Sequence, residues 1–275
     1  PRAKPIPVKK QEQIVLLGAG NVAWHLAHAL HLLNVGETEY IVTDIYSPSG
    51  VTACDLASTL GEGVHSTNDL RSLPQDADWY VFAVRDDALP ELWTQLAHHT
   101  SGTWLHTSGS TDLCSMTKYH SSTGVLYPLQ TFSKGKVLDF SSVPLYIEAS
   151  NESTLARIET LAHSLSNEVH HASSEARMAL HVAAVLSCNF SNYLITLAEE
   201  LLSAHQLPSK ALLPLLDEMI EKLHHLPARE AQTGPARRGD QMIIERHLKL
   251  LHNTPELEQL YRLLSEGIRK RFDLG

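Results

Sequence analysis

Residues 13–23 read Gln-Ile-Val-Leu-Leu-Gly-Ala-Gly-Asn-Val-Ala, and this stretch decides the fold. The run from Gln13 to Leu17 predicts a buried parallel strand. The turn that follows has the form G-x-G-x-x-A, with Gly18, Gly20 and Ala23 at the marked positions, and apolar residues then recur at helical spacing. A strand, a glycine turn and a helix in this order are typical of a dinucleotide-binding βαβ unit.

The small residues of this turn have distinct physical roles. Gly18 allows a tight turn, Gly20 lets the backbone approach a pyrophosphate, and Ala23 lets the helix lie close to the strand. The helix N-terminus offers unpaired N–H groups and a partial positive charge to phosphates. We therefore predict that a nucleotide cofactor binds at this turn.

Length and charge restrict the classes of function. A chain of 275 residues suits two domains. The formal net charge of −9 disfavours a nucleic-acid or anionic-membrane partner, since both need clustered basic charge. No apolar run approaches the roughly twenty residues of a membrane span, and residues 1–12 are expected to form a flexible tail without a signal-peptide core. Cys54, Cys114 and Cys188 are odd in number and widely spaced, which disfavours a disulfide framework and favours a cytoplasmic location.

The sequence holds 17 histidines, several of them in doublets. Adjacent residues point in different directions on a helix or strand, so doublets make poor paired metal ligands. We therefore expect no metal site.

The first part of the chain alternates strand and helix patterns. Further strands are predicted at residues 40–46, 78–84, 103–106, 124–131 and 143–149, with helices at 51–60 and from Asp86, as N-cap, to Leu96. This alternation predicts an α/β Rossmann-like domain over residues 13–172.

Ligands of open parallel sheets bind where strands end, so the strand exits give candidate cofactor contacts. These are Ser47, Val84 and Arg85. Ser47 could bond a phosphate or simply form the turn around Pro48, and Arg85 could equally be a solvated loop residue. The exit of the strand at residues 103–106 is rich in hydroxyl groups, with Thr107, Ser108 and Gly109 in sequence.

From residue 173 on the pattern is helical. Residues 175–204 contain no proline or glycine and predict a helix of about thirty residues, long for a globular domain. Further helices are predicted at 209–224, 239–252 and 255–272. We expect an all-helical second domain over residues 173–275.

One stripe of the long helix is polar. His181, Val185, Cys188 and Asn192 follow i, i+4, i+7 and i+11, and Asn189 lies close to the same face. Buried polar groups need partners, so these side chains either bond neighbouring helices or face a substrate cavity.

The segment 230–240 reads Glu-Ala-Gln-Thr-Gly-Pro-Ala-Arg-Arg-Gly-Asp. Its two arginines beside an acid could grip a carboxylate or phosphate. The alternative is an interhelical loop whose Arg and Asp side chains cap helix ends.

Taken together, the motifs resemble a bacterial two-domain family in which a Rossmann-like module precedes domain of unknown function 2520. The motifs that support the resemblance are G-A-G-N-V-A at 18–23, F-A-V-R-D-D-A-L at 82–89, L-H-T-S-G-S at 105–110, L-Y-P-L-Q-T-F-S at 126–133, H-V-A-A-V-L-S-C-N-F-S-N-Y at 181–193 and the segment 230–240. The family is similar to pyrroline-5-carboxylate reductase and to deazaflavin-dependent NADP oxidoreductases, and more distantly to 6-phosphogluconate dehydrogenase.

The resemblance implies an NADP- or NAD-binding fold, a helical C-terminal domain of the 6-phosphogluconate dehydrogenase type that forms a homodimer, and a catalytic cleft between domains. By position, the resemblance implies that the pyrophosphate is held by Gly18, Gly20, Asn21 and Val22. The cofactor would be flanked by Val84 and Arg85, and the nicotinamide would lie beside His106 to Gly109. The substrate would be faced by His181, Asn189 and Asn192. Relatives commonly read Y-S-R where this chain has Tyr46-Ser47-Pro48, which removes an arginine that would grip the 2′-phosphate of NADP. The long helix also lacks the acid/base lysine of the related dehydrogenases.

The leading hypothesis is a nicotinamide-dependent oxidoreductase acting on a small polar carbonyl or imine. His181 is the best proton donor by type, and Ser108 or Thr107 could bond the reacting oxygen or nitrogen. The alternative is a non-catalytic nucleotide-binding sensor or scaffold, which the missing lysine and Pro48 favour.

Overall fold

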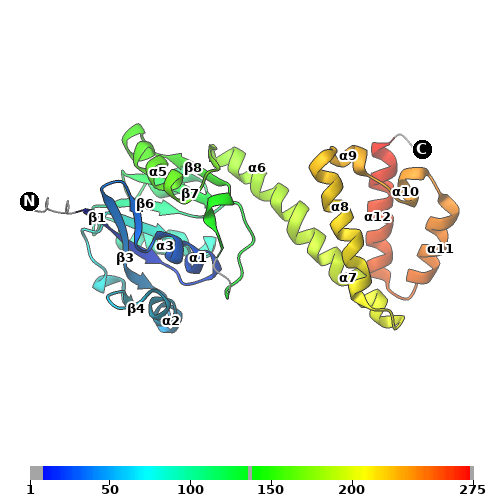
Figure 1. The fold of residues 1–275 in the computed structure, drawn as a ribbon, viewed down its shortest axis with the longest axis horizontal. Helices are drawn as coiled ribbons and strands as arrows, with labels where there is room; N and C mark the ends of the chain where they lie inside the picture. Colours follow the sequence, from blue (N-terminus) through cyan, green and yellow to red (C-terminus); the bar gives the residue numbers. More distant parts are fainter. Residues whose placement is uncertain (1–8, 136–137, 273–275) are drawn as a thin grey trace, which may run out of the picture. The chain divides into compact units, whose positions relative to one another are not determined.

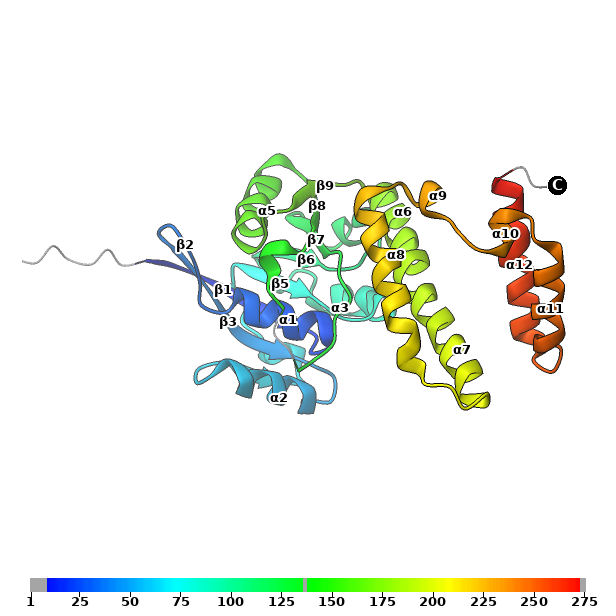
Figure 2. The same cartoon turned by 45° about the vertical axis from the view of Figure 1, so that its right-hand side comes forward.

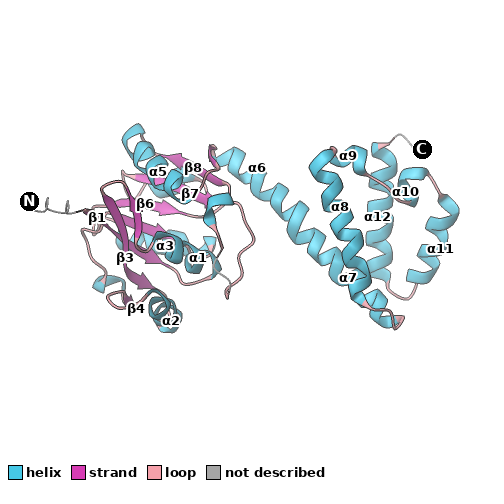
Figure 3. Ribbon diagram, viewed as in Figure 1, coloured by secondary structure: helices cyan, strands magenta, loops and turns pink. Residues whose placement is uncertain are grey.

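The computed structural model describes residues 9–135 and 138–272, which are drawn in colour in Figure 1. Contacts divide the chain into two compact units, one up to Leu186 and one from Ser187 onward. The first unit contains a mixed sheet with helices around it, and the second is helical (Figure 3). This confirms the predicted succession of an α/β Rossmann-like part and an all-helical part.

The sheet of the first unit has the strand order β2-β3-β1-β5-β6-β7-β8-β9, with β4 beside β3. The strands are β1 (Lys10–Leu17), β2 (Leu33–Val35), β3 (Thr38–Tyr46), β4 (His65–Thr67), β5 (Trp79–Phe82), β6 (Thr103–His106), β7 (Thr123–Pro128), β8 (Leu145–Ala149) and β9 (Val169–His171). The pairs that involve β1, β5 and β6 are parallel. Because β3 lies on one side of β1 and β5 on the other, the chain reverses its direction of winding at β1. A ligand crevice of a doubly wound sheet forms at such a point.

Helices cover the two faces of this sheet. They are α1 (Asn21–Leu30), α2 (Val51–Leu60), α3 (Leu89–Leu96), α4 (Leu113–Thr117) and α5 (Glu152–Leu165), and α6 (Ser174–Ala184) follows the last strand. Along β1, Ile14 and Leu16 belong to the core under α1, α2 and α5, while Val15 and Leu17 belong to the core under α3 and α4. All four side chains are fully buried, and each contributes about 1.5–3 kcal/mol by leaving water. Figure 2 shows α1 and α3 beside the central strands.

The tail expected over residues 1–12 is too long, because β1 already begins at Lys10. Residues Lys10 to Glu12 pair with Thr38 to Tyr40 of β3. Glu12 is buried and accepts a hydrogen bond from the Trp79 indole N–H at 2.7 Å. The backbone hydrogen bonds to β3 and the buried Glu12 carboxylate therefore order residues 10–12, although their polar composition is typical of a flexible segment. Residues 1–8 of the expected tail lie outside the described residues.

The second unit consists of α7 (Phe190–Ala204), α8 (Leu213–His225), α9 (Ala228–Ala231), α10 (Pro235–Arg238), α11 (Gln241–Leu251) and α12 (Pro255–Arg271). Ala236, Ile244 and Leu248 form a small core, against which Tyr261 and Ile268 of α12 pack. The helices predicted at 209–224, 239–252 and 255–272 are therefore confirmed, with ends that shift by a few residues.

The predicted long helix is present as Ser174–Ala204, and a π-helical turn at Val185–Asn189 joins α6 to α7. Among the described residues it is the one helix long and apolar enough to span a membrane, with a mean hydropathy of 1.3 in its best window. The expectation concerned uninterrupted apolar runs, and polar residues such as His181 and Asn189 interrupt this helix. That no membrane partner is involved stays a prediction.

Candidate functional site

The turn between β1 and α1 brings the glycine motif to the point where the sheet reverses its winding. Gly18 has a φ of +116°, and a Cβ there would lie 2.2 Å from the Ala83 carbonyl oxygen. This glycine is required by the fold, because the turn packs directly on the residue after β5. Gly20, the N-cap of α1, has an ordinary φ of −76°, and a Cβ there would meet no atom within 4 Å. Nothing in the fold of the described residues therefore requires a glycine at position 20, and the space in front of it is open.

Part of the loop after β7 lies against α1. The Asn21 side chain donates to the Phe132 carbonyl at 2.9 Å, and His25 Nε2 lies 2.9 Å from the Ser133 carbonyl. Lys134 Nζ donates to the Ala19 carbonyl at 3.0 Å. The Asn21 side chain thus fastens this loop, while the helix start has no side-chain cap and keeps its first N–H groups for another acceptor.

At the end of β3, Ser47 is buried and its hydroxyl oxygen accepts the Ala53 N–H at 3.1 Å. This bond holds the start of α2. Among residues 9–135 and 138–272 no acceptor for the Ser47 hydroxyl hydrogen is found, and its predicted contact with the cofactor stays a prediction.

The exit of β5 carries Val84, Arg85 and Asp86. Arg85 is largely exposed and pairs with Asp87 at 2.9 Å, and the Asp87 carboxylate raises the pKa of the guanidinium. The sequence analysis predicted Asp86 as the N-cap of α3, and this was wrong. A 3₁₀ turn at Asp86–Ala88 precedes that helix. Its carboxylate instead accepts hydrogen bonds from the hydroxyls of Ser108, at 2.8 Å, and Ser110.

His106 lies directly behind the loop that follows β6. Its ring is fully buried, and Nδ1 accepts the Ser108 N–H at 3.2 Å. Burial, assisted by the charge of Arg177, lowers the pKa of His106 from 6.5 to about 3. The ring is therefore neutral near pH 7 and braces the backbone of the Ser108 loop.

This burial predicts a pH dependence of stability. Because the folded-state pKa of His106 lies below its unfolded value, the stabilisation is complete above about pH 6.5 and is lost as the pH falls toward 3. Each pH unit in this range costs at most about 1.4 kcal/mol. Denaturant unfolding of wild type and His106→Gln between pH 7 and 4 should show a steeper loss for wild type. Parallel curves would contradict this assignment.

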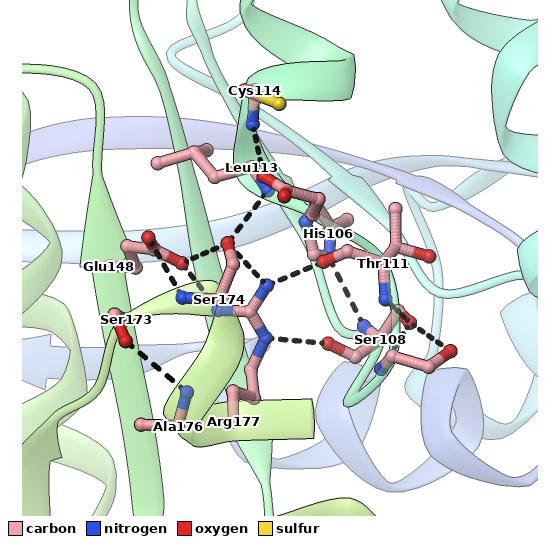
Figure 4. Close-up of polar contacts among 12 residues, drawn as sticks. His106, Ser108, Thr111, Leu113, Cys114, Glu148, Ser173, Ser174, Ala176 and Arg177 are labelled. Atoms are coloured by element: carbon pink, nitrogen blue, oxygen red, sulfur yellow. Dashed lines mark hydrogen bonds and ion pairs between the residues drawn. The ribbon is translucent and has the colours of Figure 1, made fainter. Parts of the chain in front are cut away.

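Arg177 of α6 joins three parts of the first unit (Figure 4). Its side chain is 1% exposed, donates to Glu148 of β8 at 2.5 Å, and donates to the carbonyl oxygens of Ser108 and Thr111. Ser174 adds bonds to both Glu148 oxygens. This network fixes the backbone of the loop from Ser108 to Thr111 against the start of α6.

Tyr127 and His181 meet at Gly109 of this loop. Tyr127, in β7, places its hydroxyl 3.1 Å from Nδ1 of His181 in α6. A Cβ on Gly109 would lie 2.8 Å from both His181 Nδ1 and Tyr127 Cζ, so any side chain there would force one of these two rings to shift. Burial raises the pKa of Tyr127, which keeps its hydroxyl protonated. The sequence reasoning missed Tyr127, although it lies within the quoted motif at 126–133.

The predicted stripe on the long helix assumed uninterrupted α-helical spacing, and this assumption was wrong. The π turn has i→i+5 bonds, so residues before and after it are not related by 100° per residue. Asn189 and Asn192 belong to the second unit and are exposed. Their contact with a substrate stays a prediction.

The segment 230–240 includes the short helix α10, and Asp240 is the N-cap of α11, where it accepts the Ile243 N–H at 3.3 Å. Arg229, just before the segment, donates to the Arg271 carbonyl at the end of α12 at 2.9 Å. Binding of an anion by Arg237 and Arg238 stays a prediction. Arg237 lies 4.1 Å from the Phe272 ring centroid. In the described part of the chain, no three His, Cys, Asp or Glu side chains gather in a way that could hold a metal ion.

Comparisons with known proteins agree with this picture. Residues 143–268 match the domain of unknown function DUF2520, and no curated protein matches the chain. The crystal structure of a "putative NADP oxidoreductase" from Bacteroides fragilis is 38% identical, with a TM-score of 0.86, and the match covers 94% of this chain and 98% of that one.

Two further structures share the fold at low identity. One is an imine reductase from Myxococcus stipitatus in complex with NADP+, at 15% identity and a TM-score of 0.61, covering 95% of this chain and 93% of that one. The other is a pyrroline carboxylate reductase from Plasmodium falciparum with NADP bound, at 13% identity and a TM-score of 0.54. The match covers 96% of this chain and 99% of that one. Both are similar in fold alone. The B. fragilis match decides the family: this chain belongs to the Rossmann-like oxidoreductases that contain DUF2520.

Proposed function

We propose that this chain is an NAD(P)-dependent oxidoreductase that transfers a hydride to or from a small polar carbonyl or imine. The observation that supports it best is the pair of glycines at the β1–α1 turn. Gly18 is needed by the fold, whereas Gly20 has open space in front of it and an uncapped helix start behind it. This arrangement suits a pyrophosphate that approaches the backbone. The B. fragilis relative is named as an NADP oxidoreductase, which supports the same cofactor class.

The residues present fit a dinucleotide. The N–H groups of Gly20, Asn21 and Val22 would receive the pyrophosphate, and Thr107 to Gly109 would lie beside the nicotinamide. The bound cofactor supplies the hydride. NAD and NADP both remain in the proposal. The B. fragilis relative is named for NADP, whereas Pro48 of this chain provides no cation for a 2′-phosphate.

The proton required for carbonyl or imine reduction would come from His181. The Tyr127 hydroxyl, 3.1 Å from Nδ1 of His181, would orient the ring and leave Nε2 for a substrate. The protonated, imidazolium form of His181 would give its Nε2 proton to the reacting oxygen or nitrogen and become a neutral imidazole. The Ser108 hydroxyl already donates its hydrogen to Asp86 and accepts the Ser110 and Thr111 N–H groups, so it would have to release Asp86 before it could donate to the reacting atom. Tyr127 acts here as a positioning residue.

The test of the proposed function is a calorimetric titration with NADH, NADPH and ADP-ribose, followed by turnover assays with keto and imino acids. Gly20→Ala should keep the free energy of unfolding within about 1 kcal/mol of wild type and weaken ADP-ribose binding at least about tenfold. Gly18→Ala is the contrasting variant, since it should destabilise the ligand-free protein. Absence of binding to all three ligands would overturn the proposal. Tight binding without turnover would favour the alternative, a non-catalytic nucleotide-binding sensor.

We also propose a homodimer formed through the helical part. Large apolar side chains are exposed on α7 and α8, among them Phe190, Tyr193, Leu215 and Leu223. A groove of about 540 Å³ between α7 and α12 is lined by Tyr193, four leucines and a few polar residues such as Glu200 and Glu256. Apolar patches of this kind mark association surfaces. Sedimentation equilibrium should give twice the chain mass of 30.5 kDa, and a monomer mass at micromolar concentration would contradict the dimer.

The three cysteines are free and exposed. Exposed thiols suit a reducing compartment, so we propose a cytoplasmic location.

A further inference from the structure

Lys134 lies at the glycine turn although it is distant from it in sequence. It follows β7, and its ammonium donates to the carbonyl of Ala19, the residue between Gly18 and Gly20, at 3.0 Å. Two neighbouring contacts fix the loop that carries it, from Phe132 to Asn21 and from Ser133 to His25. The cation is therefore held at the turn.

The ammonium has donors to spare. A lysine ammonium carries three N–H groups, and the Ala19 carbonyl takes one of them. Among the described residues, no carboxylate forms a salt bridge with Lys134, and the first turn of α1 contains no acidic residue. The positive charge is therefore not neutralised locally, in a chain whose net charge is −9.

A dinucleotide pyrophosphate brings two negative charges to this place. Backbone N–H groups and a helix dipole supply only partial charges, and these leave much of a phosphate charge uncompensated. An ammonium already held beside the turn gives a charge-assisted hydrogen bond at little cost in side-chain freedom.

We propose that Lys134 binds the pyrophosphate of the dinucleotide and supplies the full positive charge that the glycine turn lacks. This inference rests on the proposed function, because it needs a dinucleotide at the β1–α1 turn. The competing explanation is structural: Lys134 could serve only to hold the Ala19 carbonyl and the loop after β7.

The two explanations differ in how binding responds to salt. An ion pair with the pyrophosphate is screened by salt, so its loss flattens the dependence of binding on ionic strength. If Lys134 only holds the Ala19 carbonyl and the loop after β7, it acts through the shape of the turn. Its loss would then lower the melting temperature of the ligand-free protein and leave the salt dependence of binding unchanged.

The experiment measures ADP-ribose binding to the full chain by calorimetry at 50 and 300 mM NaCl. The variants are Lys134→Gln and Lys134→Arg, and Lys118→Gln is the matched control, since Lys118 is exposed and its loss changes the net charge equally. We expect Lys134→Gln to weaken binding about tenfold or more at low salt, with a flatter salt dependence and an unchanged melting temperature. Lys134→Arg should restore most of the affinity.

Other outcomes overturn the inference. The inference fails if Lys134→Gln binds ADP-ribose as tightly as Lys118→Gln does. It also fails if Lys134→Gln binds more weakly with an unchanged salt dependence and a lower melting temperature. If Lys134→Gln fails to fold, Lys134→Met, which keeps the aliphatic stem and removes the charge, is measured in its place: a salt dependence flatter than that of wild type supports the inference, and an unchanged salt dependence opposes it. Failure of wild type to bind ADP-ribose would instead overturn the proposed function, so the two failures are distinguishable.

Discussion

Arg177→Met is expected to lose about 3–5 kcal/mol of unfolding free energy, because it removes one partner of a buried ion pair. Met has a similar length and fills the space. It cannot donate to Glu148, nor to the carbonyl oxygens of Ser108 and Thr111. The Glu148 side chain is 22% exposed and keeps its bonds from Ser174, so the loss should fall near the lower end of this range.

Urea unfolding of the ligand-free protein measures this loss. Arg71→Met is the matched control, because the Arg71 side chain is 90% exposed and its pair with Asp69 is screened by solvent, so its loss should leave the stability nearly unchanged. Equal stabilities for the two variants would show that the bonds of Arg177 to Glu148 and to the loop from Ser108 to Thr111 do not stabilise the fold. Glu148→Gln separates charge from geometry, since the amide oxygen can still accept from Arg177.

The architecture could be predicted where the sequence has a strong period. β1, the glycine turn and α1 occupy consecutive residues, and each is marked by a distinct pattern, so the fold class was confirmed. The strands β2, β4 and β9 have three residues each, too few to show an alternation. They exist because a neighbouring strand offers a ladder, which is a tertiary effect.

The site was predicted less well, for reasons of burial. An arginine on a helix is typical of an exposed face, so Arg177 gave no signal of its own, and its burial depends on Glu148 of β8. Tyr127 lies in an apolar run and resembles a core residue, whereas its hydroxyl meets His181 across the fold. Lys134 reaches Ala19 over a long separation in sequence, and no local pattern indicates such a contact.

His181→Gln is expected to reduce kcat by about 10²–10⁴ on whichever carbonyl or imine the wild type turns over, and to leave the dissociation constant of the cofactor unchanged. Glutamine can still bond the Tyr127 hydroxyl, but it cannot deliver a proton to the substrate. The measurement is steady-state kinetics together with cofactor titration of the same preparations. The control is His163→Gln, an exposed histidine of α5.

Tyr127→Phe should have a smaller effect on kcat and should alter its pH profile, because the ring of His181 loses the hydroxyl that orients it. A purely structural tyrosine would lower stability and leave the pH profile unchanged. If His181→Gln keeps full turnover, the proton comes from another group, and the contact between Tyr127, Gly109 and His181 is a packing feature. If the variant loses both turnover and cofactor binding, His181 supports the cofactor site and the proton donor must be sought among the hydroxyls held by Asp86.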